Sequence, residues 1–359
     1  MRLHVVDPAA YTPPYDHALC AALAGLDQDV TLVTARFAHG DVPAAHGYRV
    51  DERFYRGSER FGGRARSLAR LARHVPDMLA YRRVAARAAD VVHFQWLALQ
   101  QADVRLLPHR PLVLTAHDVL PREPRHGQLA AQRQLYDRVD HVVVHSEHGR
   151  ARLTAELGVD PSRVSVIPHG VLDALLDVAP VRPPELPQPG GERPVVLFFG
   201  LIRPYKGLDL LYDAWRQLAP EAELWVVGQP RMTPPPPPPG VRCALRYVSD
   251  AEAAWCFANA DAVVLPYREI DQSGVLFTAL AFARPLVLSD VGGFPEVDAA
   301  LHVPAADVSA LADALGRVIG DPAERARLSA AARAAVATTY AWKPIAERHL
   351  ALYGTLAGR

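Results

Sequence analysis

The fold is decided by the stretch VVLFFGLIRPYKGLDLLYDAW (residues 195–215), which reads as a strand, a turn and a helix in direct succession. Its first five residues are all apolar, as in strands buried on both faces of a parallel sheet. The turn that follows contains Gly200, Arg203, Lys206 and Gly207. It brings two cations and the free N–H groups of a helix N-terminus to the carboxyl end of a strand, where open α/β sheets bind ligands. The stretch therefore predicts an anion site, and the alternative is an Arg and a Lys solvated in an ordinary loop.

Short apolar runs alternate with longer amphipathic stretches along the rest of the chain, which indicates alternating strands and helices. A first group of strands is predicted at residues 3–6, 30–33, 91–94, 112–115 and 141–145. A second group is predicted at residues 195–199, 223–227, 262–265 and 285–289. The chain of 359 residues exceeds the ~250–300 at which one hydrophobic core stops growing. The sequence therefore predicts an α/β protein with two Rossmann-like, doubly wound domains.

The boundary between the domains is predicted at VAPVRPPELPQPGGERP (residues 178–194). A stretch so dense in Pro and Gly cannot continue a helix or a central strand. The two domains are then residues 1–177 and 195–339, and a C-terminal helix follows at residues 340–359. The six-proline run at residues 234–239 predicts an exposed polyproline loop, with docking of an SH3-type domain as the alternative.

Composition argues against several classes of function. Lys plus Arg and Asp plus Glu number 39 each, so no overall charge favours nucleic-acid binding. The three cysteines, Cys20, Cys243 and Cys256, lack the spacing of a zinc site and favour a reducing compartment. The N-terminus MRLHVVDPAAYTPP lacks the apolar core of a signal peptide, and no apolar run approaches the ~20 residues that span a bilayer. We therefore expect a cytoplasmic protein.

A second polar turn lies in PYREIDQSGVLFTALAFARPLVLSDVGGFPEV (residues 266–297), again between a strand and a helix. Gln272, Ser273 and Gly274 open that helix, so we expect its N–H groups and the Ser hydroxyl to face the same cleft as Lys206. Two positive helix ends that converge on one crevice suit a diphosphate.

Together with VVVHSEHGRARLTAELGVDPSRVSVIPHGV (residues 142–171), these two segments resemble the retaining enzymes of glycosyltransferase family 4, also described as glycosyl transferases group 1. The similarity in the order of elements covers nearly the whole chain. It implies the GT-B architecture, in which two Rossmann-like domains face a central cleft and the last helix returns to the first domain. It also implies transfer of a hexosyl-type sugar from a nucleoside diphosphate to an acceptor hydroxyl, with retention of the anomeric configuration. No metal ion or other cofactor is implied, and no DxD-type pair of carboxylates is evident in the sequence.

The resemblance also assigns the contacts to the donor's pyrophosphate. It places this group on Arg203, Lys206 and the backbone amides around Ser273 and Gly274, next to Gly200. As the diphosphate leaves, Arg203 and Lys206 would stabilise the charge that develops on it.

The chain departs from the family at the contacts to the ribose and to the transferred sugar. The family usually has two Glu separated by seven residues, and here the first position holds Ile and the second holds Thr278. Thr278 therefore falls at the ribose position, while Asp271 and Gln272 are the candidates for the sugar hydroxyls. The nucleobase is expected near Tyr247 and Val248, contacted mostly through the backbone.

In the first domain, the family's glycine-rich first turn is replaced by AAYTPPYDHALCAALAG (residues 9–25). This stretch puts Tyr15, Asp16 and His17 at the N-terminus of the first helix. They are candidates to contact the acceptor, and the alternative for Asp16 is a cap or first-turn acid that stabilises its own helix. His93 and Trp96 end a neighbouring strand and are further candidates for the acceptor pocket.

His117 lies just past the predicted strand at residues 112–115, next to Asp118. By position it matches the family residue that contacts the transferred sugar. We expect it to orient the sugar rather than to act as a nucleophile. The other histidines among the 15 are expected to be structural or solvated.

Other functions stay open from the sequence alone. An inverting GT-B transferase or a sugar-nucleotide epimerase shares the two-domain plan and could use a base near Asp16 or His117. The two missing acids also allow a nucleotide-sugar binding protein whose catalytic power has lapsed. No residue names the acceptor, which can be a small molecule or lipid-linked.

Positive charge is concentrated in residues 49–87, from Arg49 to Arg87, where eleven Arg face only four acids. Leu68, Leu71 and Val75, with His74, recur near helical spacing between arginines. One face of this helix is predicted to enter the interface of an anionic membrane, on its inner face, while Arg side chains meet the headgroups. The alternative is an Arg-rich solvated helix that packs its Leu face on the first domain.

Overall fold

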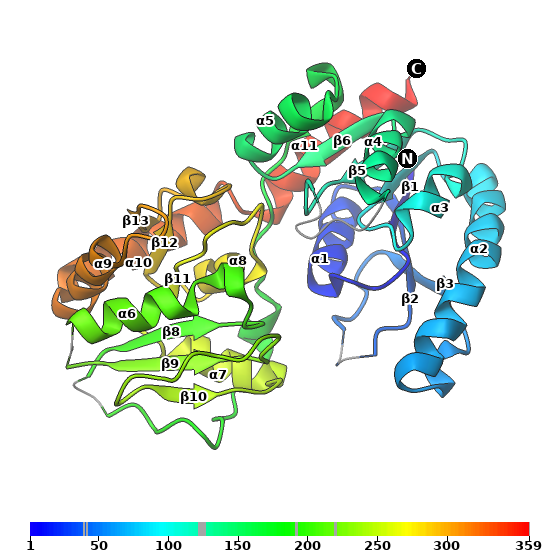
Figure 1. Cartoon of the computed structure of the whole chain (residues 1–359). Helices are drawn as coiled ribbons and strands as arrows, with labels where there is room; N and C mark the ends of the chain where they lie inside the picture. Colours follow the sequence, from blue (N-terminus) through cyan, green and yellow to red (C-terminus); the bar gives the residue numbers. More distant parts are fainter. Residues whose placement is uncertain (39, 41, 121–126, 191–192, 219–220, 359) are drawn as a thin grey trace. The chain divides into compact units, whose positions relative to one another are not determined.

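The chain divides into two compact units, each with its own parallel sheet and helices (Figure 1). The structure is a computed structural model that describes residues 1–38, 40, 42–120, 127–190, 193–218 and 221–358. Unit 1 comprises Met1–Gly170 and Trp342–Arg359, and unit 2 comprises Val171–Ala341.

The division comes at Gly170, earlier than the predicted boundary at residues 178–194. The Pro-rich stretch belongs to unit 2 because it is bonded there. The N–H of Val181 donates to the carbonyl of Ala251 at 3.0 Å, and Glu185 forms an ion pair with Arg246.

The sheet of unit 1 has the order β3-β2-β1-β4-β5-β6-β7, and every pairing in it is parallel. Its strands are β1 (Arg2–Asp7), β2 (Asp29–Ala35), β3 (Arg49–Phe54), β4 (Val91–Phe94), β5 (Leu112–Thr115), β6 (His141–Val144) and β7 (Val164–Val166). The predicted strands of this group correspond to β1, β2, β4, β5 and β6. The edge strands β3 and β7 were not predicted, because β3 reads RVDERF and is mostly exposed, and β7 has only three residues.

Six helices accompany this sheet in the described part of unit 1: α1 (Pro13–Ala24), α2 (Gly63–Ala88), α3 (Gln100–Leu106), α4 (Gln128–Arg138), α5 (Glu147–Leu157) and α11 (Trp342–Ala357). The last helix, α11, packs on α1 and β4. Its Tyr353 hydroxyl is hydrogen-bonded to Nδ1 of His93 at 2.6 Å. At its start, the Trp342 ring lies so close to Gly170 that a Cβ there would be 2.4 Å from the ring.

Helix α2 packs on unit 1 through a face that the sequence analysis did not choose. Its buried residues are His74, Asp77, Met78, Tyr81 and Ala85. The predicted apolar face, with Leu68, Leu71 and Val75, is exposed instead, so the alternative in which that face packs on the first domain is wrong. His74 belongs to the packed face, where its Nε2 lies 2.5 Å from Oδ1 of Asp103.

The sheet of unit 2 has the order β10-β9-β8-β11-β12-β13, again with parallel pairings. Its strands are β8 (Val195–Phe199), β9 (Glu223–Val227), β10 (Arg242–Ala244), β11 (Ala262–Leu265), β12 (Leu286–Ser289) and β13 (Ala300–Val303). The helices are α6 (Leu208–Leu218), α7 (Asp250–Asn259), α8 (Gly274–Ala281), α9 (Val308–Gly320) and α10 (Pro322–Ala337). The predicted strands of the second group correspond to β8, β9, β11 and β12, while β10 and β13 were not predicted.

The proline run at residues 234–239 lies between β9 and β10 and has neither helical nor strand structure. Pro238 is buried, and the other prolines of the run are half-buried or exposed. Among the described residues, no helix combines the length and the apolar character needed to cross a membrane.

Candidate functional site

The turn after β8 fixes the ammonium group of Lys206 at the carboxyl end of the sheet of unit 2. Lys206 closes a short 3-10 helix (Pro204–Lys206) and is only 6% exposed. Its Nζ lies 5.0 Å from the centre of the Tyr267 ring, which provides a cation–π contact. Gly200 has φ 107°, and a Cβ at that position would be 2.8 Å from Nζ of Lys206. The ammonium therefore lies directly over a backbone position that only glycine leaves open.

The same point is bordered by the first turn of α8. A Cβ on Gly200 would also lie 3.3 Å from Cγ2 of Val275, the second residue of that helix. The Lys206 ammonium and the N-terminus of α8 thus flank one position. The structure brings together the two predicted anion-binding elements within unit 2. Because a helix N-terminus carries partial positive charge, both flanking groups favour an anion.

The chain uses lysine almost nowhere else. Of its 39 Lys and Arg residues, only Lys206 and Lys343 are lysines. An ammonium is a compact point charge, whereas the guanidinium of Arg is a broad planar fork. The narrow space over Gly200 fits the smaller group, which explains why this position departs from the preference for Arg in the rest of the chain.

A clamp that the sequence analysis missed holds this turn in place. The N–H of Arg268 donates to the carbonyl of Tyr205 at 2.7 Å, and its guanidinium forms two hydrogen bonds with Asp209, at 2.7 and 2.9 Å. These bonds hold the pKa of Asp209 below its usual range. Gly207 completes the clamp, because its φ is 69° and a Cβ there would lie 2.0 Å from the carbonyl oxygen of Pro266.

The predicted donor residues around α8 differ in what they can still bind. Asp271 and Ser273 are buried, and Gln272 is half-buried. Ser273 is the N-cap residue, but its side chain does not cap the helix. The Thr278 hydroxyl donates to the carbonyl of Gly274 at 3.0 Å, so its hydrogen is used inside the helix and only its oxygen can accept a further bond.

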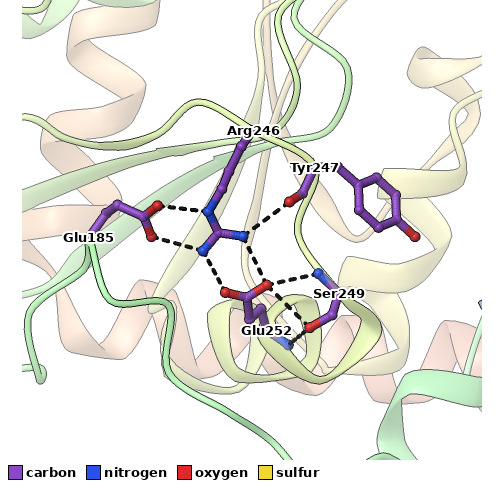
Figure 2. Close-up of polar contacts among 5 residues, drawn as sticks. All are labelled: Glu185, Arg246, Tyr247, Ser249 and Glu252. Carbon is purple, nitrogen blue, oxygen red and sulfur yellow. Dashed lines mark hydrogen bonds and ion pairs between the residues drawn. The ribbon is translucent and has the colours of Figure 1, made fainter.

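An ion-pair network fixes the segment predicted to meet the nucleobase (Figure 2). The Arg246 guanidinium binds both oxygens of Glu185, at 2.7 and 2.9 Å, and both oxygens of Glu252, at 2.6 and 3.0 Å. It also donates to the carbonyl of Tyr247 at 3.0 Å. Glu252 forms a capping box with Ser249 at the start of α7, and its bond from Arg246 lowers its pKa to about 2.

The network leaves the two predicted base-binding residues in different environments. The Tyr247 side chain is 58% exposed and projects away from the ion pairs, as Figure 2 shows. The neighbouring Val248 is buried. The backbone here is therefore rigid while an aromatic ring stays accessible.

In unit 1, the first strand ends in a buried pair of carboxyl groups. Asp7 and Asp16 are at most 1% exposed, and a hydrogen bond links their side chains. Asp7 also accepts backbone N–H bonds from Ala9 at 3.0 Å, from Thr12 at 3.2 Å and from Tyr11. Burial raises the pKa of Asp16 well above its usual range, and the charge of Asp7 raises it further. Asp16 lies in the first turn of α1, as the sequence alternative proposed, and its raised pKa favours the protonated form, which can donate to Asp7.

Histidines lie at or just past the carboxyl ends of β4, β5, β6 and β7. They are His93, His117, His145 and His169, all buried. Burial lowers the pKa of each of them, to about 4 for His145 and well below the usual value for the others. These four side chains are thus polar but uncharged near neutral pH. Of these four residues, the sequence analysis singled out only His93 and His117.

The hydrogen-bond chain fixes the tautomer of His117. Nδ1 of His145 donates to the carbonyl of Ile167 at 2.9 Å, because a carbonyl can only accept. Nε2 of His145 is then an acceptor, so Nδ1 of His117 donates to it at 3.2 Å. Oε1 of Gln95 lies 3.1 Å from Nε2 of His117, and exchanging the O and N of this amide supplies the NH2 donor that neutral His117 then needs. Both ring nitrogens of His117 already have partners inside unit 1.

The remaining predicted acceptor residues are held in unit 1 by specific contacts. His17 is hydrogen-bonded to Tyr48, with Nδ1 2.6 Å from the hydroxyl. His93 joins β4 to α11 and β5 through Tyr353 and Thr115. The Trp96 ring is stacked on His117, 4.9 Å between centroids, and donates from Nε1 to Thr12 at 2.9 Å. The buried Tyr15 hydroxyl has no hydrogen-bond partner among the described residues.

Metal ligands do not gather at either sheet edge in the described part of the chain. No group of three His, Cys, Asp or Glu side chains there could hold an ion. The three cysteines are all free.

Two regions of the chain match families of known proteins. Residues 15–174 match the family described as Glycosyltransferase Family 4, and residues 193–321 match the family described as Glycosyl transferases group 1. The chain belongs to the group 1, family 4 glycosyltransferases. It is an enzyme that transfers a sugar from a nucleotide sugar, as the resemblance implied.

Individual relatives are similar over most of the chain. The GDP-mannose:glycolipid 4-beta-D-mannosyltransferase of Xanthomonas campestris pv. campestris is 28% identical, over 61% of this chain and 68% of that protein. The alpha-maltose-1-phosphate synthase of Mycolicibacterium smegmatis is also 28% identical, over 75% of this chain and 79% of that protein.

Solved structures agree on the architecture. Sucrose-phosphate synthase from Thermosynechococcus elongatus superposes with a TM-score of 0.74 at 21% identity and covers 99% of both chains. Anabaena HepE in complex with UDP and glucose gives a TM-score of 0.70 at 16% identity, with 99% of this chain and 100% of that chain covered. The glycosyltransferase therefore has the GT-B fold with two Rossmann-like domains, as predicted.

The proton assignment in the carboxyl pair has a measurable pH dependence. In the folded state Asp16 keeps a proton that the unfolded chain releases near pH ~4. The wild-type protein should therefore lose stability relative to Asp16→Asn as the pH rises above ~4, because the amide can still donate to Asp7 without titrating. Urea unfolding of both proteins at pH ~4 and ~7 measures this difference.

The exposed Asp313 supplies the control, since Asp313→Asn should leave the pH dependence of the wild-type protein almost unchanged. A stability difference between the wild-type protein and Asp16→Asn that stays constant with pH would contradict the proton assignment. So would a difference that shifts in favour of the wild-type protein.

Proposed function

We propose that this glycosyltransferase transfers a hexosyl-type sugar from a nucleoside diphosphate to an acceptor hydroxyl, with retention of configuration and without a metal ion. The observation that carries the proposal is the single position flanked by the Lys206 ammonium and the first turn of α8, over Gly200. The donor's pyrophosphate is assigned to this position. Exposed Arg203, which precedes the turn, adds a second cation for the same phosphates.

The proposed mechanism follows from the charge that develops on the leaving diphosphate. A preorganised cation and a helix N-terminus stabilise that charge where it appears, without reorganising at the moment of reaction. In unit 2 this leaves no role that requires a divalent ion. An oxygen of the departing phosphate takes the proton of the acceptor hydroxyl, so that the acceptor enters on the face that the diphosphate leaves. We assign the orientation of the transferred sugar to neutral His117.

Contacts to the rest of the donor are assigned by what each group can still offer. The Thr278 oxygen can accept from a ribose hydroxyl, because its own hydrogen is bonded to Gly274. Asp271 and Gln272 are assigned to hydroxyls of the transferred sugar. Tyr247 and the backbone beside Val248 are assigned to the nucleobase.

The acceptor residues divide into two groups. Asp16 and His17 line a small cavity of about 30 Å³ in unit 1, so we keep them as acceptor contacts. Tyr15, His93 and Trp96 pack within unit 1, and we assign them to shaping the region. Relatives are named for a glycolipid and for sugar-phosphate products, which places both lipid-linked and soluble acceptors within the proposal.

Inverting transfer is the second candidate, because the Xanthomonas relative is named for a 4-beta linkage whereas the mycobacterial relative is named for an alpha product. Stereochemistry distinguishes the two. We expect the product linkage to have the anomeric configuration of the donor, and we expect turnover to continue in excess EDTA. Proton NMR of the first product formed in EDTA buffer measures both the anomeric configuration of the linkage and the turnover without a metal ion. An inverted anomer, or activity that is lost in EDTA and restored by magnesium, would overturn the respective part of the proposal.

Lys206→Ala should lower kcat/KM by ~10²-fold or more, because it removes a preorganised cation from the leaving group. Lys206→Arg should fail to restore the activity, since the broader guanidinium does not fit over Gly200. The exposed Lys343 provides the matched control, and Lys343→Ala should keep wild-type turnover. Steady-state kinetics with a nucleotide-sugar panel, on variants with unchanged thermal unfolding, provide the comparison. Near-native turnover of Lys206→Ala would contradict the pyrophosphate assignment.

We also propose that α2 makes a peripheral contact with anionic membranes. Its outward face carries an apolar stripe of Leu68, Leu71, Val75 and Leu79, which are 66%, 55%, 42% and 39% exposed. Exposed or half-buried arginines border the stripe at both ends of the helix, namely Arg64, Arg82, Arg83 and Arg87. An apolar stripe flanked by arginines matches a helix that lies in the interface of an anionic bilayer.

Vesicle sedimentation tests the membrane contact. The wild-type protein should bind phosphatidylglycerol vesicles at low salt, bind phosphatidylcholine vesicles weakly, and release the former as salt rises. The double variant Leu68→Gln/Leu71→Gln should lose binding, while Leu176→Gln, which alters an equally exposed Leu in unit 2, should retain it. Equal binding by both variants, or no binding to either lipid, would overturn the contact.

A further inference from the structure

A cavity in unit 1 is lined by four arginines. It is separate from the sheet edge that carries the four buried histidines. Its volume is about 290 Å³, near the lower end of the range for small-ligand pockets. It lies where the ends of β2 and β3 meet the first turns of α2. We call it the arginine pocket, and its charged lining residues are Arg36, Glu52, Arg56, Glu59, Arg66 and Arg70.

Two of these arginines stand one helical turn apart, and neither forms an ion pair within the described part of the chain. Arg66 and Arg70 are both half-buried, and they occupy positions i and i+4 of α2. Among the described residues, no acceptor bonds the buried Nε of Arg66. Arg70 donates to the carbonyl of Ala9 at 3.0 Å and lies 4.6 Å from the centre of the Tyr55 ring. Neither the hydrogen bond nor the ring contact neutralises its charge. Like charges at this spacing repel one another.

The electrostatics agree with this geometry. Burial lowers the pKa of Arg70 and the adjacent Arg66 lowers it further, while Tyr55 and Asp7 offset only part of this effect. The carboxylates of the pocket do not offset the repulsion between Arg66 and Arg70, because Glu52 and Glu59 are exposed at its rim. Arg56 is directed to an acid outside the pocket lining, with Nη2 3.6 Å from Asp51. The pocket lining thus contains four arginines and two exposed acids. The cavity leaves room for an anion between its rim and the guanidinium groups of Arg66 and Arg70.

The arginine pocket adjoins the acceptor candidates. It shares Ala35 and Glu52 with the smaller cavity that Asp16 and His17 line. A ligand bound by the inner arginines would therefore extend toward these two side chains. The pocket belongs to unit 1, whereas the Lys206 turn assigned to the donor belongs to unit 2.

We propose that the arginine pocket binds a phosphomonoester group carried by the acceptor substrate, with Arg66 and Arg70 as its principal ligands. The proposal rests on the proposed transfer to an acceptor hydroxyl. A guanidinium matches two phosphate oxygens at once, and a phosphomonoester supplies the double negative charge that two adjacent arginines require. The pocket selects the acceptor by this group, while the reacting hydroxyl lies on the side of Asp16 and His17.

Calorimetric titration of the full chain without donor tests the arginine pocket directly. The probes are inorganic phosphate, glucose 6-phosphate and glucose at constant ionic strength. The wild-type protein should bind both phosphates and not glucose, and Arg66→Gln should weaken that binding by about tenfold or more. Arg105→Gln removes an exposed arginine from α3, outside the pocket lining, and should bind as the wild-type protein does. Arg70→Gln, on protein with unchanged thermal unfolding, should repeat the loss.

Further measurements identify the kind of acceptor and distinguish a failure of this proposal from a failure of the donor assignment. Bound inorganic phosphate is then displaced with glucose 6-phosphate or with phosphatidic acid vesicles. Stronger competition by glucose 6-phosphate indicates a soluble acceptor, and stronger competition by the vesicles indicates a lipid-linked one. Lys206→Ala should keep the part of the phosphate binding that Arg66→Gln loses, so a failure of the donor assignment does not imitate a failure of the arginine pocket. Absence of phosphate binding in the wild-type protein, or equal affinity in Arg66→Gln and Arg105→Gln, would overturn the proposal.

Discussion

The donor half of this enzyme depends on one constraint, which is the placement of a buried ammonium over a glycine. Taking a charge out of water is unfavourable unless its surroundings compensate for it. Here the Tyr267 ring lies beside Lys206, and Gly200 leaves open the space that Nζ occupies. The Arg268–Asp209 clamp and the close approach of Gly207 to Pro266 then keep the turn from relaxing. The cation is thus oriented before any ligand arrives, which is what stabilisation of a leaving diphosphate requires.

The two units present opposite electrostatics at the carboxyl ends of their strands. The edge of unit 2 holds a cation and a helix N-terminus, which suit phosphate oxygens. The edge of unit 1 holds a row of neutral histidines, which offer donors and acceptors without charge, and a carboxyl pair that shares one proton. Such groups suit the hydroxyls of a sugar. One fold, repeated twice, thereby presents surfaces for the two chemically different parts of a glycosyl transfer.

Local sequence was sufficient to predict those features whose partners lie nearby in the chain. The nine predicted strands are mostly apolar, and the Lys206 turn and the start of α8 each come after a strand. Strand β3 was missed because edge strands are half-solvated and RVDERF carries four charged residues. The predicted domain boundary lay too late, since a Pro-rich stretch gives no sign that Glu185 binds Arg246. The pairs Asp7–Asp16 and Arg268–Asp209 could not be predicted, because each joins residues that only the folded sheet brings together. The outward direction of Leu68 and Leu71 likewise depends on which face of α2 packs on unit 1, and the spacing alone does not decide it.

The central claim is that the leaving diphosphate is held by Lys206 and by the N-terminus of α8. A crystal structure of the enzyme with a nucleoside diphosphate, UDP or GDP, tests it most directly. The account predicts phosphate oxygens within hydrogen-bond distance of Nζ of Lys206 and of the backbone amides of Ser273 and Gly274, with no metal ion between them. Phosphates bound away from Lys206, or bridged to the protein by a divalent ion, would contradict it.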